Sequence, residues 1–527
     1  MRLHSWQRHM GRRLLSLMLT VTLGLTAACG TAQEQETHGA LGQRLIVGDP
    51  SFNEANEIPS ANPQEAYSGW ACLRYGLGET LFRFNEQMEA QPWLAESLTA
   101  QDDLTWELLL RGDVCFSDGE KLDAAAVKAC LERLVKNLDR AAELLALEAI
   151  DLPDGPQGRR LILHTKKPVA ILRQILADPM TCMVQAAALD RGELIGTGPF
   201  VLRELESNRR MLLDRNDRYW AGPVGLEGLE VRNFSDSQSL SLALQSGDIH
   251  AAQSVPYTAY PELKARGFQI DAVETSRVFF VEWNLHNALC QEPLVRQAVD
   301  LALNREDFCQ KLLQGHASPC SGPFPKQLAA APELPTVEQN IEQAGHLLEQ
   351  AGWKDENGDG IRERGGQPLQ LKLLTYPSRP ELPVLATYMA DCLRTIGVDV
   401  QVEVNQEYRQ RLKDPGNWDL LASSMVTAPL GETSYFLHQV LSTEGLANRS
   451  GYANPKFDEL VRELEGSQDE TRRRQLSAKA LEYIQAERPC IFVAHLRMGL
   501  VAHPDLEGLQ AWPSDTYIIH AQMRWKK

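Results

Sequence analysis

The order of hydrophobic and polar residues predicts alternating strands and helices. Every second residue is apolar along 104–110, which predicts a strand with one buried face. Between 127 and 138 apolar residues recur at spacings of three and four, and Asp123 precedes them as a candidate cap. This pattern predicts an amphipathic helix. Strands and helices predicted in this way alternate along the chain, which is typical of the α/β class.

The segment 369–404 shows this alternation most clearly. Residues 369–375 are predicted as a strand, 381–396 as a helix that stops at Gly397, and 398–404 as a strand with valine at every second position. Because the connections are short, this strand–helix–strand unit predicts a parallel pair of strands. The same periodicity predicts further helices over 338–351 and 469–486.

The N-terminus carries the pattern of an export signal. Residues 1–13 are basic, 14–28 are apolar or small, and Cys29 follows. The sequence Thr26-Ala27-Ala28-Cys29 resembles the lipobox of bacterial lipoproteins, in which the cysteine thiol takes a diacylglycerol. We predict a signal peptide over 1–28 and a lipidated Cys29 with a polar tether over 29–43. The alternative is cleavage near Ala28 by ordinary signal peptidase, with Cys29 unmodified.

The charge balance excludes several classes of partner. The 527 residues contain 53 Lys and Arg against 70 Asp and Glu, a net charge of −17. The first 29 residues hold four arginines and no acid, so the rest carries −21. Such an acidic body argues against nucleic acid and against a broad membrane-binding surface. No later segment has an apolar run long enough to span a bilayer, so we expect membrane contact through the lipid anchor alone.

The sequence has no enzyme motif and no resident metal site that we can identify. GxSxG, HExxH, the P-loop and GxGxxG are absent, and the nine cysteines after Cys29 include no CxxC pair. Residues 355–366 match the first half of a calcium loop. Gly366 stands where that loop needs a bidentate glutamate, so a polar turn is favoured. His438 is a candidate direct metal ligand, with simple packing as the alternative.

A set of segments resembles a known family. The segments are Gly69-Trp70, Arg74 to Leu81, Gln91 to Ser97, Gly196 to Phe200, Ala243 to Asp248, Val295 to Ala298 and Ala351 to Trp353. In this order they resemble the extracytoplasmic solute-binding proteins of bacterial ABC importers, family 5, over essentially all of 44–527. The resemblance implies a periplasmic or other extracytoplasmic protein without catalytic activity or cofactor, which delivers a solute to ABC permease and ATPase subunits. We expect a monomer.

Within this family the chain looks most like the branch that binds nickel and metallophores. Three segments carry this likeness: Tyr75 to Thr80, Thr375 to Pro383 and Thr427 to Phe436. On that alignment Arg140 is carried over as a chelate contact. Met180 stands where a second arginine is expected, and Val426 and Leu430 stand near a tryptophan and a tyrosine of that site. The implied solute is a nickel or other metal chelate, with the metal bound only inside the chelate. A short peptide is the alternative solute, and an exported enzyme or structural lipoprotein is the competing class.

The resemblance implies an α/β fold of the two-lobe, type II periplasmic-binding-protein kind, with an extra subdomain and a hinge. The expected bounds are 44–277 plus 490–527 for the large lobe, about 71–195 for the inserted subdomain within it, and 278–489 for the second lobe. Crossovers between the lobes are expected near 278–284 and 487–493.

We expect ligand contacts from Arg140, Arg379, Trp283 and Tyr376. Arg379 lies between a strand end and a helix start, where open α/β sheets bind ligands, and its guanidinium suits a carboxylate. Tyr376 lies in the same connection. A ligand with two carboxylates could bridge Arg140 and Arg379. The alternatives are a surface position for Arg379, beside two prolines, and core packing for Trp283.

Overall fold

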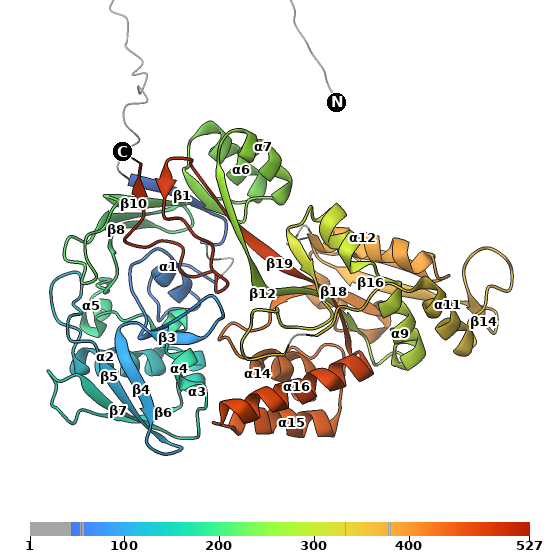
Figure 1. The fold of residues 1–527 in the computed structure, drawn as a ribbon, viewed down its shortest axis with the longest axis horizontal. Coiled ribbons are helices and arrows are strands. Elements are labelled where there is room, and N and C mark those ends of the chain that lie inside the picture. The colour runs from blue at the N-terminus through green and yellow to red at the C-terminus, as the bar shows by residue number, and fades with distance from the viewer. Residues whose placement is uncertain are drawn as a thin grey trace, which may run out of the picture. The chain divides into compact units, whose positions relative to one another are not determined.

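Two long strands, β12 (Gln269–Trp283) and β19 (Cys490–Ala502), are antiparallel neighbours in an 11-stranded sheet and lie side by side in Figure 1. The computed structural model describes residues 44–526, apart from Asn53, Ala55, Asn56, Glu333, Ser378 and Pro380. The predicted signal peptide, Cys29 and the tether lie outside the described residues. No helix in the part of the chain that the structure describes is long and apolar enough to cross a membrane.

Beyond β12 the sheet contains the predicted strand–helix–strand unit. The elements are β16 (Gln370–Thr375), α12 (Glu381–Arg394), β17 (Asp399–Val404) and β18 (Leu420–Val426). The sheet order runs from β12 through β18 and β16 to β17. β16 pairs in parallel with β17 and β18, whereas β18 is antiparallel to β12. The parallel unit predicted over 369–404 is therefore confirmed.

Beyond β19 the sheet continues with five strands. In sheet order they are β11 (Ala251–Gln253), β1 (Arg44–Asp49), β10 (Gly228–Asn233), β9 (Arg210–Arg215) and β8 (Phe200–Glu206). β1 is parallel to both of its neighbours, and β10, β9 and β8 are antiparallel. Helix α6 (Ser237–Ser246) begins after Asp236, whose side chain accepts two backbone N–H groups. It ends at Gly247, where φ is +82°.

A second, antiparallel sheet has four strands. In sheet order they are β4 (Ala95–Ala100), β5 (Thr105–Leu110), β7 (Arg160–Thr165) and β6 (Leu147–Asp151). β5 confirms the predicted strand, although Leu104 precedes it and is 41% exposed. Helix α2 (Ala124–Asn137) begins as predicted, because the Asp123 side chain accepts the Ala126 N–H at 3.0 Å.

Further elements complete the fold. The further helices are α1 (Gly69–Arg74), α3 (Asp139–Leu145), α4 (Leu172–Ile175), α5 (Ala186–Asp190), α7 (Tyr260–Ala265), α8 (Ala288–Gln291), α9 (Pro293–Ala302), α10 (Arg305–Asp307), α11 (Ile341–Gln350), α13 (Tyr408–Arg411), α14 (Ser434–Phe436), α15 (Pro455–Gly466) and α16 (Glu470–Glu487). Single 3₁₀ or π turns are η2 (Pro179–Thr181), η3 (Tyr257–Ala259), η4 (Phe308–Leu312), η5 (Pro415–Asn417) and η6 (Leu437–Leu441). Short strands are β2 (Phe82–Phe84), β3 (Ala90–Pro92), β13 (Ala317–Pro319), β14 (Glu363–Arg364), β15 (Gln367–Pro368), β20 (Leu506–Glu507) and β21 (Arg524–Trp525). α11 and α16 confirm the helices predicted over 338–351 and 469–486.

We call the elements on the β11 side, together with the four-stranded sheet, the first half, and those on the β18 side the second half. The two halves touch, because Ala428 and Leu430 of the second half pack in the main core of the first. Gln174 on α4 also donates a hydrogen bond to Glu432, which follows β18, at 3.4 Å. The predicted bounds of the lobes and of the inserted subdomain remain a prediction.

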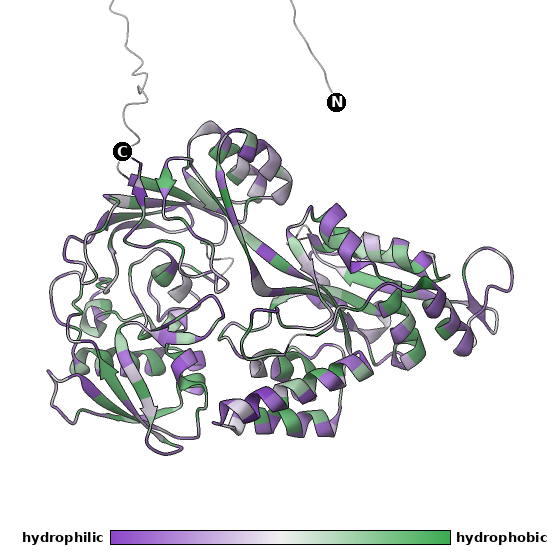
Figure 2. Cartoon of the chain, in the orientation of Figure 1, coloured by the Kyte–Doolittle hydropathy of each residue, from purple (hydrophilic) through white to green (hydrophobic). Residues whose placement is uncertain are grey.

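Strand β12 separates two hydrophobic cores in the second half, because successive side chains of a strand point to opposite faces of the sheet. Phe279 and Trp283 pack in the core that includes α9, α11 and α12. Phe280 packs in the other core, where its ring centroid is 5.7 Å from Phe436 and 6.0 Å from Phe492. The covering helices carry hydrophobic and hydrophilic faces, as α15 and α16 show in Figure 2.

Candidate ligand-binding site

Arg277 and Arg379 lie close together where β12 enters the second half. Arg277 is opposite Val426 in the β12–β18 pairing, and Arg379 lies in the connection between β16 and α12. Burial and then repulsion by Arg379 lower the pKa of Arg277 to about 9. Within the described ranges neither guanidinium forms an ion pair or donates a hydrogen bond. Two partly buried cations without such a partner favour an anion between them.

Asp515 lies on the first-half side of this pair. The Asp515 carboxylate attracts Arg277, but the same carboxylate also interacts with other residues. Arg74 forms an ion pair with Asp515 at 3.1 Å and with Asp49 at 2.9 Å. Gln253 also donates a hydrogen bond to Asp515. Because Asp515 is already engaged by Arg74 and Gln253, it compensates Arg277 incompletely.

Tyr376 lies in the same connection as Arg379, between β16 and α12. Its ring stacks on Tyr408, with centroids 4.3 Å apart and planes 24° apart. Its hydroxyl accepts the backbone N–H of Ser424 at 3.2 Å. Burial raises the pKa of Tyr376, and the Arg379 charge opposes that shift. These contacts hold the Tyr376 ring in place, so its aromatic face has a fixed position near Arg379.

The first residue of α12 faces the first half. The Glu381 carboxylate raises the pKa values of Tyr257 and Tyr260, second to burial, and it also attracts Arg277. Since α12 has 14 residues, its N-terminal dipole adds positive potential next to Arg379. The arginine pair, Tyr376 and Glu381 therefore form one group that involves both halves of the molecule. We call this group the arginine site.

Arg140 belongs to a different group. Its guanidinium contacts both carboxylate oxygens of Asp178, at 2.6 and 3.2 Å, and the Met180 Sδ at 3.3 Å. Burial lowers the pKa of Arg140, but Asp178 outweighs this effect and the net shift is upward. The phenols of Tyr67 and Tyr435 lie nearby and add to that upward shift. Arg140 therefore has an internal carboxylate partner, and it shares none of these neighbours with Arg379.

Trp283 is buried inside the second half. Its side chain is 0% exposed and packs in the core that includes α9 and α12. The core alternative is thus the arrangement that the structure has, because burying the large indole against Phe279 and its neighbours removes its apolar surface from water.

His438 lies on η6 and pairs with a carboxylate. Its Nδ1 is 3.2 Å from the Glu465 Oε1, and this hydrogen bond raises the pKa of His438. The described residues contain one group of three or more His, Cys, Asp or Glu side chains with metal-ligand spacing, and His438 is not part of it. The geometry of His438 is that of a surface ion pair.

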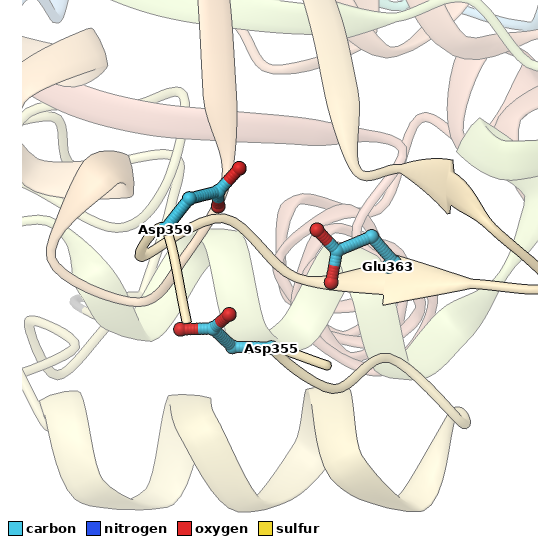
Figure 3. Close-up of side chains that lie close together, drawn as sticks. All are labelled: Asp355, Asp359 and Glu363. Carbon is cyan, nitrogen blue, oxygen red and sulfur yellow. The ribbon is translucent and has the colours of Figure 1, made fainter. Parts of the chain in front are cut away.

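That one group is the loop that resembles a calcium site (Figure 3). The carboxylates of Asp355, Asp359 and Glu363 lie within 4.8 Å of one another. Asp355 accepts the N–H of Gly358 at 2.7 Å, and Glu363 accepts the side-chain amide of Asn357 at 2.6 Å. The carboxylates thus hold their own loop together, as expected for a polar turn. The sequence pattern did not indicate that Glu363 would join them.

Arg277 is the candidate site residue that our sequence reasoning missed. Within 275–283, a run that otherwise packs inside the sheet, Arg277 and Glu282 are the charged residues. Glu282 has a partner, since Arg449 contacts it at 2.9 Å. A charge in a buried strand, directly before the crossover predicted at 278, was the available signal.

Comparison with known proteins places the chain in a family. Residues 89–448 match the bacterial extracellular solute-binding proteins, family 5, middle region. The nickel-binding protein NikA of Staphylococcus aureus is 25% identical over 450 residues, which cover 85% of this chain and 89% of the relative. The oligopeptide-binding protein AppA of Bacillus subtilis is 25% identical over 545 residues, which cover 96% of this chain and 97% of the relative.

Solved structures share the fold. The nickel ABC transporter protein from Bacillus halodurans superposes with a TM-score of 0.78 at 29% identity, over 91% of this chain and 99% of that chain. S. aureus NikA in complex with Ni(L-His)2 superposes with a TM-score of 0.73 at 24% identity, over 92% of this chain and 100% of that chain. These likenesses confirm the predicted two-lobe α/β fold. The chain therefore belongs to the family 5 bacterial extracellular solute-binding proteins and is the substrate-binding protein of an ABC importer.

Proposed function

We propose that this protein captures a metal chelate bearing carboxylate groups, with nickel as the leading metal, and delivers it to an ABC permease and its ATPase. One observation carries the proposal: Arg379 repels Arg277, and neither guanidinium has an ion-pair partner among the residues described. A ligand carboxylate would compensate both charges and offset the repulsion between them. Guanidinium groups bind carboxylates with two parallel hydrogen bonds, which also fixes the orientation of the ligand.

The metal enters already chelated in this proposal. The metal-spaced group found in the described residues is the loop of Asp355, Asp359 and Glu363, whose oxygens hold its own turn. Hard oxygen ligands of this kind suit calcium or magnesium more than nickel, which prefers imidazole and other nitrogen donors. The ligands of a nickel ion would therefore come from the chelator. The complex of S. aureus NikA with Ni(L-His)2 gives an example of such a solute for that relative.

A short peptide is the second candidate solute. B. subtilis AppA, an oligopeptide-binding protein, is as similar in sequence as NikA and is covered over more of its length. The carboxyl terminus of a peptide would suit the same arginine pair. Glu381 supports this candidate, because it forms no ion pair with the residues described and its charge acts on Arg277. An ammonium group would fit Glu381, whereas the amines of a metal chelate are occupied by the metal.

Calorimetric titration of the purified, ligand-stripped protein distinguishes these solutes. Ni²⁺ with L-histidine should bind one to one, and Ni²⁺ alone or a tripeptide should bind at least 100-fold more weakly. Glu381→Gln should leave chelate binding within about twofold. Tight binding of the tripeptide that Glu381→Gln weakens tenfold or more would make the peptide the solute. Tight binding of bare Ni²⁺ would contradict the chelate proposal.

We further propose that the protein works at the extracytoplasmic face of the membrane as a monomeric lipoprotein anchored through Cys29. The relatives are extracytoplasmic or periplasmic solute-binding proteins, which supports the location. The anchor is supported by the sequence over 26–29. Two or more acyl chains, at about 0.8 kcal/mol per buried CH₂, would retain an acidic body that has no membrane-spanning helix among the residues described.

A further inference from the structure

Three buried cysteines meet in the first half of the molecule. Cys72 lies on α1, Cys130 on α2, and Cys182 directly follows η2. Their side chains are 0%, 1% and 0% exposed. Gly78 passes between two of them: a Cβ at this position would lie 2.9 Å from the Cys72 Sγ and 3.2 Å from the Cys182 Cβ. Cys72 and Cys182 thus border the same point of the core.

The backbones that carry Cys72 and Cys182 are in direct contact. A Cβ at Gly69, at the start of α1, would lie 2.6 Å from the Pro179 carbonyl oxygen of η2. Burial raises the pKa of the Cys182 thiol, and the nearby Cys72 thiol raises it further. The two sulfur atoms are therefore neighbours, and the elements that carry them are packed together.

Cys130 is engaged differently. Its Sγ donates a hydrogen bond to the Cys182 backbone oxygen at 3.7 Å and accepts one from the Gln64 Nε2 at 3.6 Å. Its sulfur is therefore engaged by a carbonyl and an amide. Of the three cysteines, we therefore take Cys130 as the one that stays unpaired.

We propose that Cys72 and Cys182 form a disulfide bond in the exported protein. The two thiols give up two protons and two electrons as the Sγ–Sγ bond forms, and a protein or small-molecule disulfide accepts them and becomes two thiols. Because both side chains are fully buried, this exchange takes place before the core closes during folding. The extracytoplasmic location of the family provides the oxidising compartment that disulfides require. The proposal rests on that location and is independent of the solute.

The bond would fasten the four-stranded sheet to the rest of the first half. This sheet and α2 lie in sequence between Cys72 and Cys182, so the bond would close a loop that contains them. Closing so long a loop restricts the unfolded chain strongly. It would also leave little room at Gly78, since a Cβ there would lie close to both the Cys72 Sγ and the Cys182 Cβ.

Mass spectrometry tests the pairing directly. Full-length protein recovered from the extracytoplasmic compartment is unfolded in excess iodoacetamide without reductant and then digested. We expect a Cys72–Cys182 cross-linked peptide pair, with Cys130 alkylated. Recovery of Cys72 and Cys182 as alkylated peptides, or of Cys130 linked to either, would overturn the proposal.

Thermal unfolding with and without dithiothreitol provides a second measurement. Reduction should lower the melting temperature of the wild type and of Cys130→Ala by about 3–5 °C. The double variant Cys72→Ala/Cys182→Ala should show no such dependence on the reductant. Equal sensitivity of the double variant and the wild type would contradict the pairing. If the double variant fails to fold, the mass-spectrometric result decides.

Discussion

Arg379 repels Arg277, although one residue precedes α12 and the other lies on β12, about one hundred positions earlier in the chain. Burial and this repulsion bring the pKa of Arg277 to about 9, well below the ordinary value for arginine. The protein therefore keeps two like charges together at a cost to its own stability. Such a cost is typical of a site that waits for a ligand of opposite charge.

We predict that Arg277→Gln weakens ligand binding but stabilises the ligand-free protein. A cation whose pKa is lower in the folded than in the unfolded state reduces stability at pH 7, because the unfolded state holds its proton more favourably. Removing the charge should raise the melting temperature of the ligand-free protein by about 1–3 °C. Affinity for the chelate should fall at least about 30-fold. Differential scanning fluorimetry and calorimetry measure the two effects.

Arg394→Gln is the matched control for this prediction, because Arg394 lies at the other end of α12 with a side chain that is 66% exposed. Arg394→Gln should change neither the melting temperature of the ligand-free protein nor the affinity for the chelate. An Arg277→Gln variant that melts below the wild type and binds as tightly would show that Arg277 has a structural role alone.

We predict that Arg379→Ala prevents ligand-induced closure of the two lobes. A ligand shifts an open–closed equilibrium only if it binds one state more tightly, and Arg379 reaches the site from the second half. Small-angle scattering should show the wild type becoming more compact with Ni²⁺ and L-histidine, and Arg379→Ala unchanged. Gln174→Ala, which removes the 3.4 Å contact with Glu432, should still close. Closure of Arg379→Ala at saturating ligand would contradict the mechanism.

We predict that His495 makes the protein less stable below pH 6.5. Burial lowers the pKa of His495 to about 4 and outweighs the backbone groups of Phe324 and Gly322, which favour the charged ring. Because the unfolded state binds the proton more readily, stability is lost as the pH falls from about 6.5 to 4. In His495→Asn the melting temperature should therefore fall less steeply over this pH range than in the wild type. The rest should remain, since burial also lowers the pKa of His250 to about 4. An unchanged pH profile would refute the assignment.

We predict that Glu79→Gln stabilises the protein above pH 7. Burial raises the pKa of Glu79 to about 7, although its carboxylate accepts hydrogen bonds from Tyr219 at 2.5 Å and Trp220 at 2.7 Å. An acid whose pKa is raised on folding loses stability as the pH rises from its ordinary value of 4.5 to its folded value of about 7, and the cost stays in full above that. The neutral amide avoids this cost. The melting temperature of the variant should therefore be higher than that of the wild type at pH 8 and equal to it near pH 5. A lower melting temperature at pH 8 would contradict this.

We predict that Cys29→Ala releases the protein from the membrane. Without the thiol no diacylglycerol can be attached, and the described part of the chain contains no helix that could cross a bilayer. Fractionation should move the protein from the membrane pellet to the soluble extracytoplasmic fraction. Retention of a processed variant in the pellet, at wild-type amounts, would argue against the lipid anchor.

The local sequence pattern determined the individual elements. The strand–helix–strand unit of β16, α12 and β17 and the Asp123 cap of α2 follow from periodicity and capping over a few neighbouring residues. The family likewise followed from short segments in a fixed order along the chain. Such signals are readable because they depend on residues close together in sequence.

The tertiary structure decided which distant side chains meet. Arg277, Arg379 and Asp515 come from three separate segments, so no spacing in the sequence could show that Arg379 repels Arg277 while Asp515 is engaged by Arg74. Trp283, likewise, could line a cleft or fill a core until the packing around it was known. Charge repulsion, desolvation and packing act between residues that folding brings together, and their outcome depends on three-dimensional distance, which sequence order does not contain.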